Sequence, residues 1–174
     1  AKDMVDYENI YIVDTLTAAA GIRLLCEVAI NWIGENRSVE NIVSDLEELK
    51  ERVHIYAGLD TLEYLAKGGR ISKTAAAIGT LASIKPIICT DHGEVVVAGK
   101  TRGVNKATSI VCEKMQSDIV DTLYPVYTLY SYGLENVEKL ESKLDLDVQR
   151  VRIGSTIGVH IGPNAFGVCF ISKL

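Results

Sequence analysis

Apolar side chains recur at helical spacing in the first third of the chain. From Thr17 to Asn36 the apolar stripe is wider than that of a simple surface helix, which predicts a helix with two packing partners. The pattern breaks at Glu35–Arg37, and Ser38 is a suitable N-cap for a second helix. The stripe of this second helix consists of Ile42, Val43, Leu46 and Leu49. Further helical patterns follow at residues 62–66, 75–81, 104–116 and 134–144.

Runs rich in β-branched residues alternate with these helical patterns. They cover residues 9–15, 54–59, 84–89, 94–99, 126–130, 148–153 and 166–171. Asp91-His92-Gly93 predicts a somewhat long turn between the third and fourth runs, and hence an antiparallel hairpin. Elsewhere, the alternation of strands with helices favours parallel pairing. The pattern therefore predicts an α/β fold, a three-layer sandwich around a mixed sheet that is mostly parallel and includes one antiparallel hairpin.

The composition narrows the possible partners and the compartment. Of 174 residues, 48% are hydrophobic and the formal net charge is −5, with no basic run for a nucleic-acid surface. Arg23 and Glu27 interrupt the longest apolar stretch, Leu16–Ile33, so we expect no membrane span, while transient membrane contact stays open. The four cysteines are isolated from one another and no secretory signal is recognisable. Both features favour a reducing, cytoplasmic location.

The clearest candidate for chemistry is the glycine-rich segment 154–165, between the last two β-type runs. Its glycines let the backbone approach a ligand, and His160 can hold or transfer a proton near neutral pH. A helix starting near Pro163 would add free N–H groups that suit an anion. Spacing alone favours the ordinary interpretation, a hydrogen-bonded structural histidine. The three histidines are isolated from each other and from the cysteines, so we expect no metal site.

A second candidate segment runs from Thr61 to Ile84. Gly68-Gly69 most simply ends a short helix, which leaves Arg70 as a surface cation. Residues 74–84 carry no charge and mix small with branched apolar side chains, which suits either core packing or the wall of a narrow apolar pocket. Arg102 follows the predicted hairpin and could meet an anion, although cations at a strand end usually lie in solvent. No phosphate-binding loop, nucleophile elbow or zinc motif occurs in the sequence.

Four motifs follow one another in the chain between residues 8 and 172. They are Thr61-Leu62-Glu63-Tyr64-Leu65 with Gly68-Gly69-Arg70-Ile71, Ile84-Lys85-Pro86-Ile87, Gly99-Lys100-Thr101-Arg102-Gly103, and Ile157-Gly158-Val159-His160-Ile161-Gly162-Pro163. Together and in this order, they resemble the DegV family of bacterial fatty-acid-binding proteins. The segment Ile12-Val13-Asp14-Thr15 is similar to the family's usual Val-Ile-Asp-Ser, with Thr15 in place of serine.

The resemblance implies a two-domain α/β protein that holds one long-chain fatty acid, with the carboxylate near the domain interface and the tail in the second domain. Many members present the carboxyl group to a separate fatty-acid kinase. The match covers only the last part of the family's length, and the head-group segments similar to Thr-Ser-Gln-Pro and Ser-Gly-Thr have no counterpart here. Residues 1–37 resemble the last βα unit of the first domain, and residues 38–174 resemble the second, tail-binding domain.

The resemblance also assigns site residues, with His160 as the carboxylate partner. The other expected head-group residues are Gly162, Arg102 and Arg70, and the candidate tail contacts, taken from the uncharged segment and its neighbours, are Leu65, Ile78, Leu81 and Ile84. We therefore expect a non-catalytic lipid-binding protein without a cofactor. Two alternatives stay open. One is a small-molecule enzyme with His160 as general base or nucleophile, which needs a titratable partner. The other is an acidic docking module without a pocket.

Overall fold

The computed structural model describes residues 2–4, 6–72 and 84–174. Its strands are β1 Val53–Gly58, β2 Ile84–Asp91, β3 Glu94–Arg102, β4 Tyr127–Tyr130, β5 Gln149–Arg152 and β6 Phe166–Ile171. Its α-helices are α1 Ala20–Gly34, α2 Val39–Leu49, α3 Glu63–Lys67, α5 Val104–Ser117, α6 Glu135–Glu141 and α7 Ser155–Ile161. Short 3-10 helices cover Lys2–Met4 and Lys50–Arg52. The helix predicted at residues 75–81 lies outside the described residues.

The six strands form one mixed sheet with the order β3-β2-β1-β6-β4-β5. Among these strands β4 and β5 pair in parallel, whereas all the other neighbours are antiparallel. The mixed sheet and the hairpin are confirmed, but the prediction of a mostly parallel sheet is wrong. Alternation with helices gives parallel pairing only where the connection crosses to the opposite end of the sheet. Here the chain leaves β1 and enters β2 at the same end, where Gly58 lies opposite Ile87.

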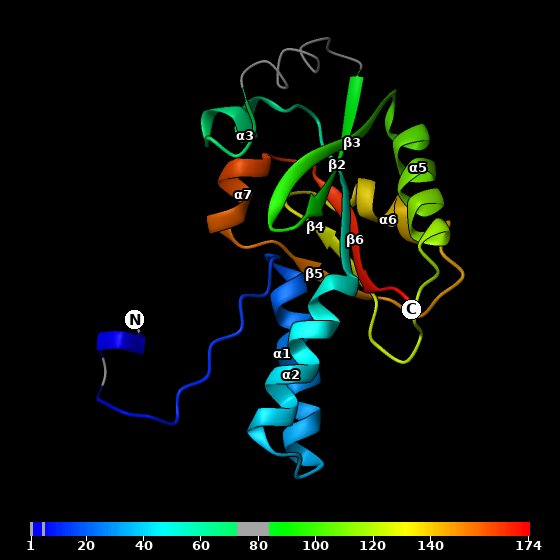
Figure 1. Cartoon of the computed structure of the whole chain (residues 1–174). Coiled ribbons are helices and arrows are strands. Elements are labelled where there is room, and N and C mark those ends of the chain that lie inside the picture. The colour runs from blue at the N-terminus through cyan, green and yellow to red at the C-terminus, as the bar shows by residue number, and fades with distance from the viewer. Residues whose placement is uncertain (1, 5, 73–83) are drawn as a thin grey trace.

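The hairpin of β2 and β3 turns more tightly than the sequence predicted. Asp91 lies opposite Glu94, and the two residues between them have left-handed backbones, with φ of 45° at His92 and 84° at Gly93. This is the geometry of a two-residue turn that matches the natural twist of the strands. A register shift between Ile87 and Ile88 bends the pair, and Figure 1 shows β3 curving across the sheet.

Helices cover both faces of the sheet, which confirms the three-layer sandwich (Figure 1). One core lies between the sheet and helices α5 and α6, and the other between the sheet and α1, α2, α3 and α7. The central strand β6 is buried along its whole length. Its side chains alternate between the two cores, as successive residues of a strand do. Val168 belongs to the core on the α5–α6 side and Cys169 to the opposite core.

Helices α1 and α2 form a helical hairpin that extends beyond the sheet (Figure 1). The predicted break between them is confirmed, and Asn36 there has a φ of 60°. The guanidinium of Arg37 lies 4.4 Å from the centroid of the Trp32 ring. Ser38 caps α2 as predicted, since its hydroxyl accepts a hydrogen bond of 3.3 Å from the N–H of Asn41.

Residues 9–15 form no strand, contrary to the sequence prediction. A strand needs a neighbouring strand for its backbone groups. In the described part of the chain this segment lies beside α2 and away from the sheet, with the Tyr11 hydroxyl donating to Glu40 at 2.9 Å (Figure 1). Of the βα unit expected at residues 1–37, the structure therefore contains the helix α1.

Candidate functional site

His160 lies in the last turn of α7, the short helix that connects β5 to β6. The predicted helix start near Pro163 is wrong, because α7 begins at Ser155 and ends before Pro163. Gly162 terminates the helix with a φ of 78°, and proline is common directly after such an end. The end of α7 that carries His160 is therefore the negative end of the helix dipole. An anion placed there needs a hydrogen-bond donor, and the imidazole can supply it.

The imidazole of His160 packs against the backbone of Gly68, at the end of α3. A β-carbon at residue 68 would stand 2.0 Å from Nδ1 of His160, so that only glycine fits beside the ring. Nδ1 is buried and has no hydrogen-bond partner among residues 2–4, 6–72 and 84–174. Within the described residues, the histidines paired with carboxylates are His54 and His92, not His160. The ring therefore has unused hydrogen-bonding capacity at a buried position.

Tyr64 of α3 covers the turn that follows α7. A β-carbon at Gly162 would lie 2.4 Å from Cδ2 of the Tyr64 ring, so glycine is required here for its contact as well as for its positive φ. The next residue, Leu65, is buried in the same core as Ile161. Helices α3 and α7 thus pack closely through two glycines, and we call this pair of helices with Gly68 and Gly162 the α3–α7 clasp (Figure 1).

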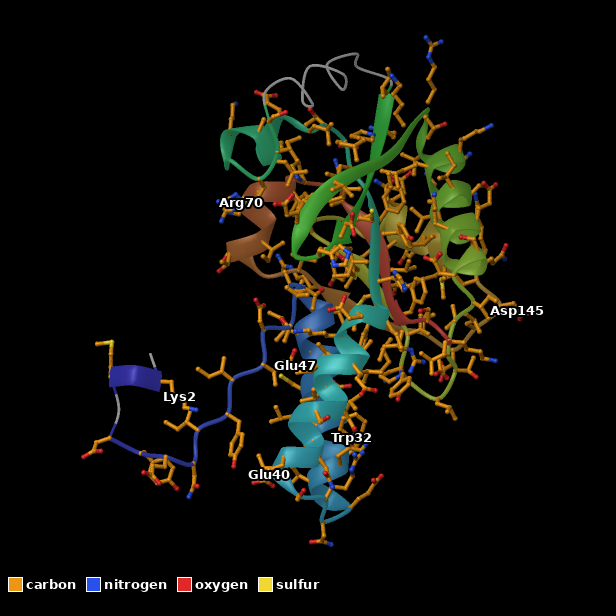
Figure 2. The ribbon with its side chains drawn as sticks, viewed as in Figure 1. Lys2, Trp32, Glu40, Glu47, Arg70 and Asp145 are labelled. Atoms are coloured by element: carbon orange, nitrogen blue, oxygen red, sulfur yellow. The ribbon has the colours of Figure 1, made fainter. Side chains whose placement is uncertain are left out.

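The two predicted head-group cations occupy different places. The Nη1 atom of Arg70 donates to the carbonyl oxygen of Gly68 at 2.7 Å, which places Arg70 beside the clasp. Figure 2 shows this exposed side chain on the outer side of α7. Arg102 is exposed at the end of β3, opposite Ile84 on β2. The structure therefore brings Arg70, Gly162 and His160 together, while Arg102 lies on the edge strand of the sheet.

Two open hollows adjoin the clasp. One, of about 680 Å³, lies between Gly69–Ser72 and Gly93–Val97. The other, of about 530 Å³, is lined among others by Tyr64, Ser131 and Val159. Both volumes are typical of small-molecule sites. Val95–Val97 of β3 give the first hollow an apolar side, whereas Arg70, Ser72 and Glu94 add polar groups to its lining.

The predicted tail contacts are only partly described. Leu65 is 1% exposed and belongs to the core, and Ile84 is half-buried at the start of β2, so that neither lines the two hollows. Ile78 and Leu81 lie outside the described residues, and the contact of all four with a ligand stays a prediction. Sequence reasoning missed Tyr64, Ser131 and Val95–Val97. Tyr64 stood in a quoted family motif, and the run Val95–Val97 was visible in the sequence, but its half-exposed place on an edge strand was not.

The described residues offer no other obvious centre for chemistry. No helix among them is long and apolar enough to cross a membrane. No group of three histidine, cysteine or acidic side chains in this part of the chain is arranged to hold a metal ion. The four cysteines are free thiols, and burial raises the pKa of Cys169 to about 12, which keeps this thiol protonated and unreactive.

The structure is an α/β domain in which the α3–α7 clasp holds His160, whose buried Nδ1 has no partner among the described residues, and two open hollows adjoin this clasp. Residues 1–173 match the family described as "Uncharacterised protein, DegV family", and the chain belongs to the DegV family. The resemblance inferred from the four motifs is thereby confirmed.

Relatives and solved structures agree with this assignment. The chain is 32% identical over 179 residues to a DegV domain-containing protein of Caldanaerobacter subterraneus subsp. tengcongensis, covering 99% of this chain and 64% of the relative. A fatty-acid-binding DegV family protein from Thermus thermophilus shares 28% identity with a TM-score of 0.82, over 94% of this chain and 61% of that one. A stearic acid-binding protein from Eubacterium ventriosum shares 28% identity with a TM-score of 0.79, over 99% and 62%. The chain thus spans less than two thirds of its relatives' length.

Proposed function

We propose that this protein binds a long-chain fatty acid, with the carboxylate at His160 and the hydrocarbon tail along the hollow that the valines of β3 line. The observation that carries the proposal is the buried Nδ1 of His160, which has no partner among the described residues. Buried polar atoms are almost always hydrogen-bonded, so an unpartnered one is a position where a bound group can supply the missing partner. The fatty acids named for the relatives from Thermus thermophilus and Eubacterium ventriosum have the required chemistry, an acceptor group on an apolar chain.

The energetics assign different tasks to the two ends of the ligand. Burying about fourteen methylenes at ~0.8 kcal/mol each contributes roughly 11 kcal/mol before the costs of association. A hydrogen bond to a charged group contributes only about 1.5–3 kcal/mol net. The tail therefore sets the affinity, and His160 sets the position of the carboxylate.

The wider setting of this binding site is part of the same proposal. We propose further that a separate kinase subunit phosphorylates the carboxylate, so that this chain itself binds without catalysis. Arg70, exposed beside His160, is suited to the head group or to the kinase. We place the protein in the cytoplasm, with residues 1–37 belonging to a first domain and residues 38–174 forming the tail-binding domain.

The natural full-length protein provides the test. After purification, denaturing mass spectrometry and organic extraction are expected to reveal a co-purified long-chain fatty acid, and added palmitate or oleate should raise the melting temperature. At a ligand concentration of 100 times Kd, the stabilisation is about 2.7 kcal/mol. His160→Gln is expected to weaken this effect, while His92→Gln, at a site whose side chain is 79% exposed, serves as the matched control. The proposal is wrong if no fatty acid co-purifies and neither lipid changes the melting temperature.

A further inference from the structure

The turn between α7 and β6 is bonded at both ends by one serine side chain, that of Ser131. Ser131, directly after β4, donates from its hydroxyl to the carbonyl oxygen of Gly162 at 2.7 Å. The same hydroxyl accepts a hydrogen bond of 3.1 Å from the N–H of Ala165. The backbone N–H of Ser131 donates to the carbonyl oxygen of Ala165, also at 3.1 Å. One side chain therefore connects both ends of the turn Gly162–Ala165 and fixes its width.

A second set of contacts supports the same turn from the outside. The side-chain amide of Asn164 donates to Asp60 Oδ2 at 2.8 Å, and Lys85 donates to Asp60 Oδ1 at 2.7 Å. Asn136 of α6 donates to the carbonyl oxygen of Asn164 at 2.9 Å. Asn164 itself has a φ of 58°, a backbone conformation that asparagine tolerates better than most residues. Ser131, Asp60 and Asn136 thus each bond a turn of four residues, and Lys85 supports it indirectly through Asp60.

The position of His160 depends on this turn. Gly162 forms the last hydrogen bond of α7, from its N–H to the carbonyl oxygen of Gly158 at 2.9 Å, and His160 lies two residues earlier. A helix of seven residues is not stable by itself, so tertiary contacts decide where its last turn lies. Gly162 is also the residue on which Tyr64 packs. A displacement of the Gly162 carbonyl would therefore move the end of α7 and the imidazole ring with it.

We propose that Ser131 is a positioning residue for carboxylate recognition, acting through Gly162 on His160. This inference rests on the proposed fatty-acid function, because it assigns a role in the same site. Ser131 lines the 530 Å³ hollow next to the clasp, and threonine carries its hydroxyl on the same β-carbon. Threonine can therefore replace serine and keep both hydrogen bonds, whereas alanine leaves the Gly162 carbonyl and the Ala165 N–H without their partner.

The experiment compares Ser131→Ala with Ser131→Thr in the natural full-length protein. Palmitate affinity is measured by competition with a fluorescent fatty acid, and the carboxylate is observed by NMR with palmitate labelled with ¹³C at C1. We expect Ser131→Ala to weaken binding about tenfold and to shift the carboxyl resonance. Ser131→Thr should retain at least half of the wild-type affinity and the wild-type resonance. The control is Thr128→Val, on the strand β4 that directly precedes Ser131. This variant removes a buried hydroxyl that bonds Glu141 and does not contact the turn.

A second readout separates this inference from the proposed function. Labelling the histidine rings with ¹⁵N gives signals for His54, His92 and His160, and Ser131→Ala should change the His160 signals alone in the ligand-free protein. If wild-type protein binds no palmitate, the proposed function fails, and unchanged His160 signals in Ser131→Ala would overturn the positioning role as well. If wild type binds palmitate and Ser131→Ala binds it equally well, the positioning role is wrong while fatty-acid binding stands. Equal losses in Ser131→Ala and Thr128→Val would also overturn it, since a general loss of stability would then explain the effect.

Discussion

The backbone of Gly68 lies directly against the imidazole of His160, and a β-carbon on residue 68 would stand 2.0 Å from Nδ1. Gly68 has a φ of −78°, a conformation that any residue adopts, so its backbone does not require glycine. Glycine is favoured at position 68 because the His160 ring leaves no space for a β-carbon. The neighbouring Gly69, with a φ of 70°, is the glycine that the end of α3 needs for conformational reasons. The two adjacent glycines therefore serve different purposes, one for the fold and one for the site.

This contact predicts the effect of Gly68→Ala. Because alanine fits the backbone of residue 68, the variant should fold, but its methyl group must displace the His160 ring. We expect an unfolding free energy lower by about 1–3 kcal/mol, as for other overpacked sites. Palmitate affinity should fall at least tenfold if His160 binds the carboxylate. Urea unfolding and palmitate titration measure the two effects, and an unchanged affinity would separate His160 from the head group.

Gly34→Ala provides the matched glycine variant. Gly34 ends α1, and a β-carbon there would have nothing within 4 Å. Alanine restricts the unfolded chain and favours the helix, so we expect a gain of about 0.4–1 kcal/mol in the free energy of unfolding. Palmitate binding should not change. A decrease in the melting temperature of this variant would show that the end of α1 makes contacts that the structure does not contain.

The contact between Tyr127 and Glu27 predicts how α1 is held on the sheet. The Tyr127 hydroxyl donates to Glu27, and this bond, followed by the one from Arg23, lowers the pKa of Glu27 below its ordinary value. Such a carboxylate stabilises the fold at pH values above its unfolded pKa, and the contribution is lost as the pH falls through the folded pKa. Since the Glu27 side chain is 36% exposed, we expect Tyr127→Phe to cost only about 1 kcal/mol at pH 7.

The pH dependence of that cost is the sharper measurement. Urea unfolding of wild type and Tyr127→Phe should give curves that converge as the pH is lowered toward 3, because Glu27 becomes protonated in both. The unfolding curves of wild type and Glu27→Gln, in which Tyr127 is unchanged, should converge in the same way as the pH is lowered. A difference between wild type and Tyr127→Phe that is constant from pH 7 to pH 3 would contradict the role of the charged bond.

The lowered pKa of His54 predicts a second loss of stability as the pH falls, in a higher pH range than that of Glu27. Burial lowers the pKa of His54, and Asp118, 3.9 Å from Nδ1, opposes this only partly. The unfolded chain therefore takes up the proton more readily than the folded protein, so stability should decrease as the pH falls below about 6.5. His54→Gln can keep the hydrogen bond to Ser172 without a titrating group. Its unfolding free energy between pH 7.5 and 5.5 should vary less than that of wild type, and parallel curves would exclude this assignment.

Helices α1, α2, α3, α5 and α6 and the hairpin could be predicted from the sequence because their signals are local, whereas α7 was missed and a helix start was placed near Pro163 instead. The wide apolar stripe of α1, the capping hydroxyl of Ser38 and the glycine after His92 each act within a few residues. The direction of the strands depends instead on which end of the sheet each connection reaches, and no local pattern states this. The strand expected at residues 9–15 failed for the same reason, since its strand-like residues lack a neighbouring strand in this part of the chain.

Some residues of the candidate site could likewise be predicted from local motifs, and others could not. His160 and Arg70 could be named from the family motifs, and the structure brings both of them to the α3–α7 clasp. Ser131 lies about thirty residues before the turn that it holds, in a stretch without a recognisable motif. It reaches that turn because β4 pairs antiparallel with β6, which places Tyr130 opposite Phe166. Because the sequence predicted a mostly parallel sheet, it did not indicate that the end of β4 lies beside the start of β6.

The central place of β6 in the sheet has a consequence during synthesis. β6 follows all the other described strands in the chain, yet it alone joins β1, where Val53 lies opposite Ile171, to β4. Until the ribosome releases this segment, the β3-β2-β1 half and the β4-β5 half have no strand in common, and each exposes an apolar edge. Pairing between such distant segments is slow and leaves the nascent chain open to aggregation. The exposed edges of the two halves therefore persist until β6 has been synthesised and has paired with both of them.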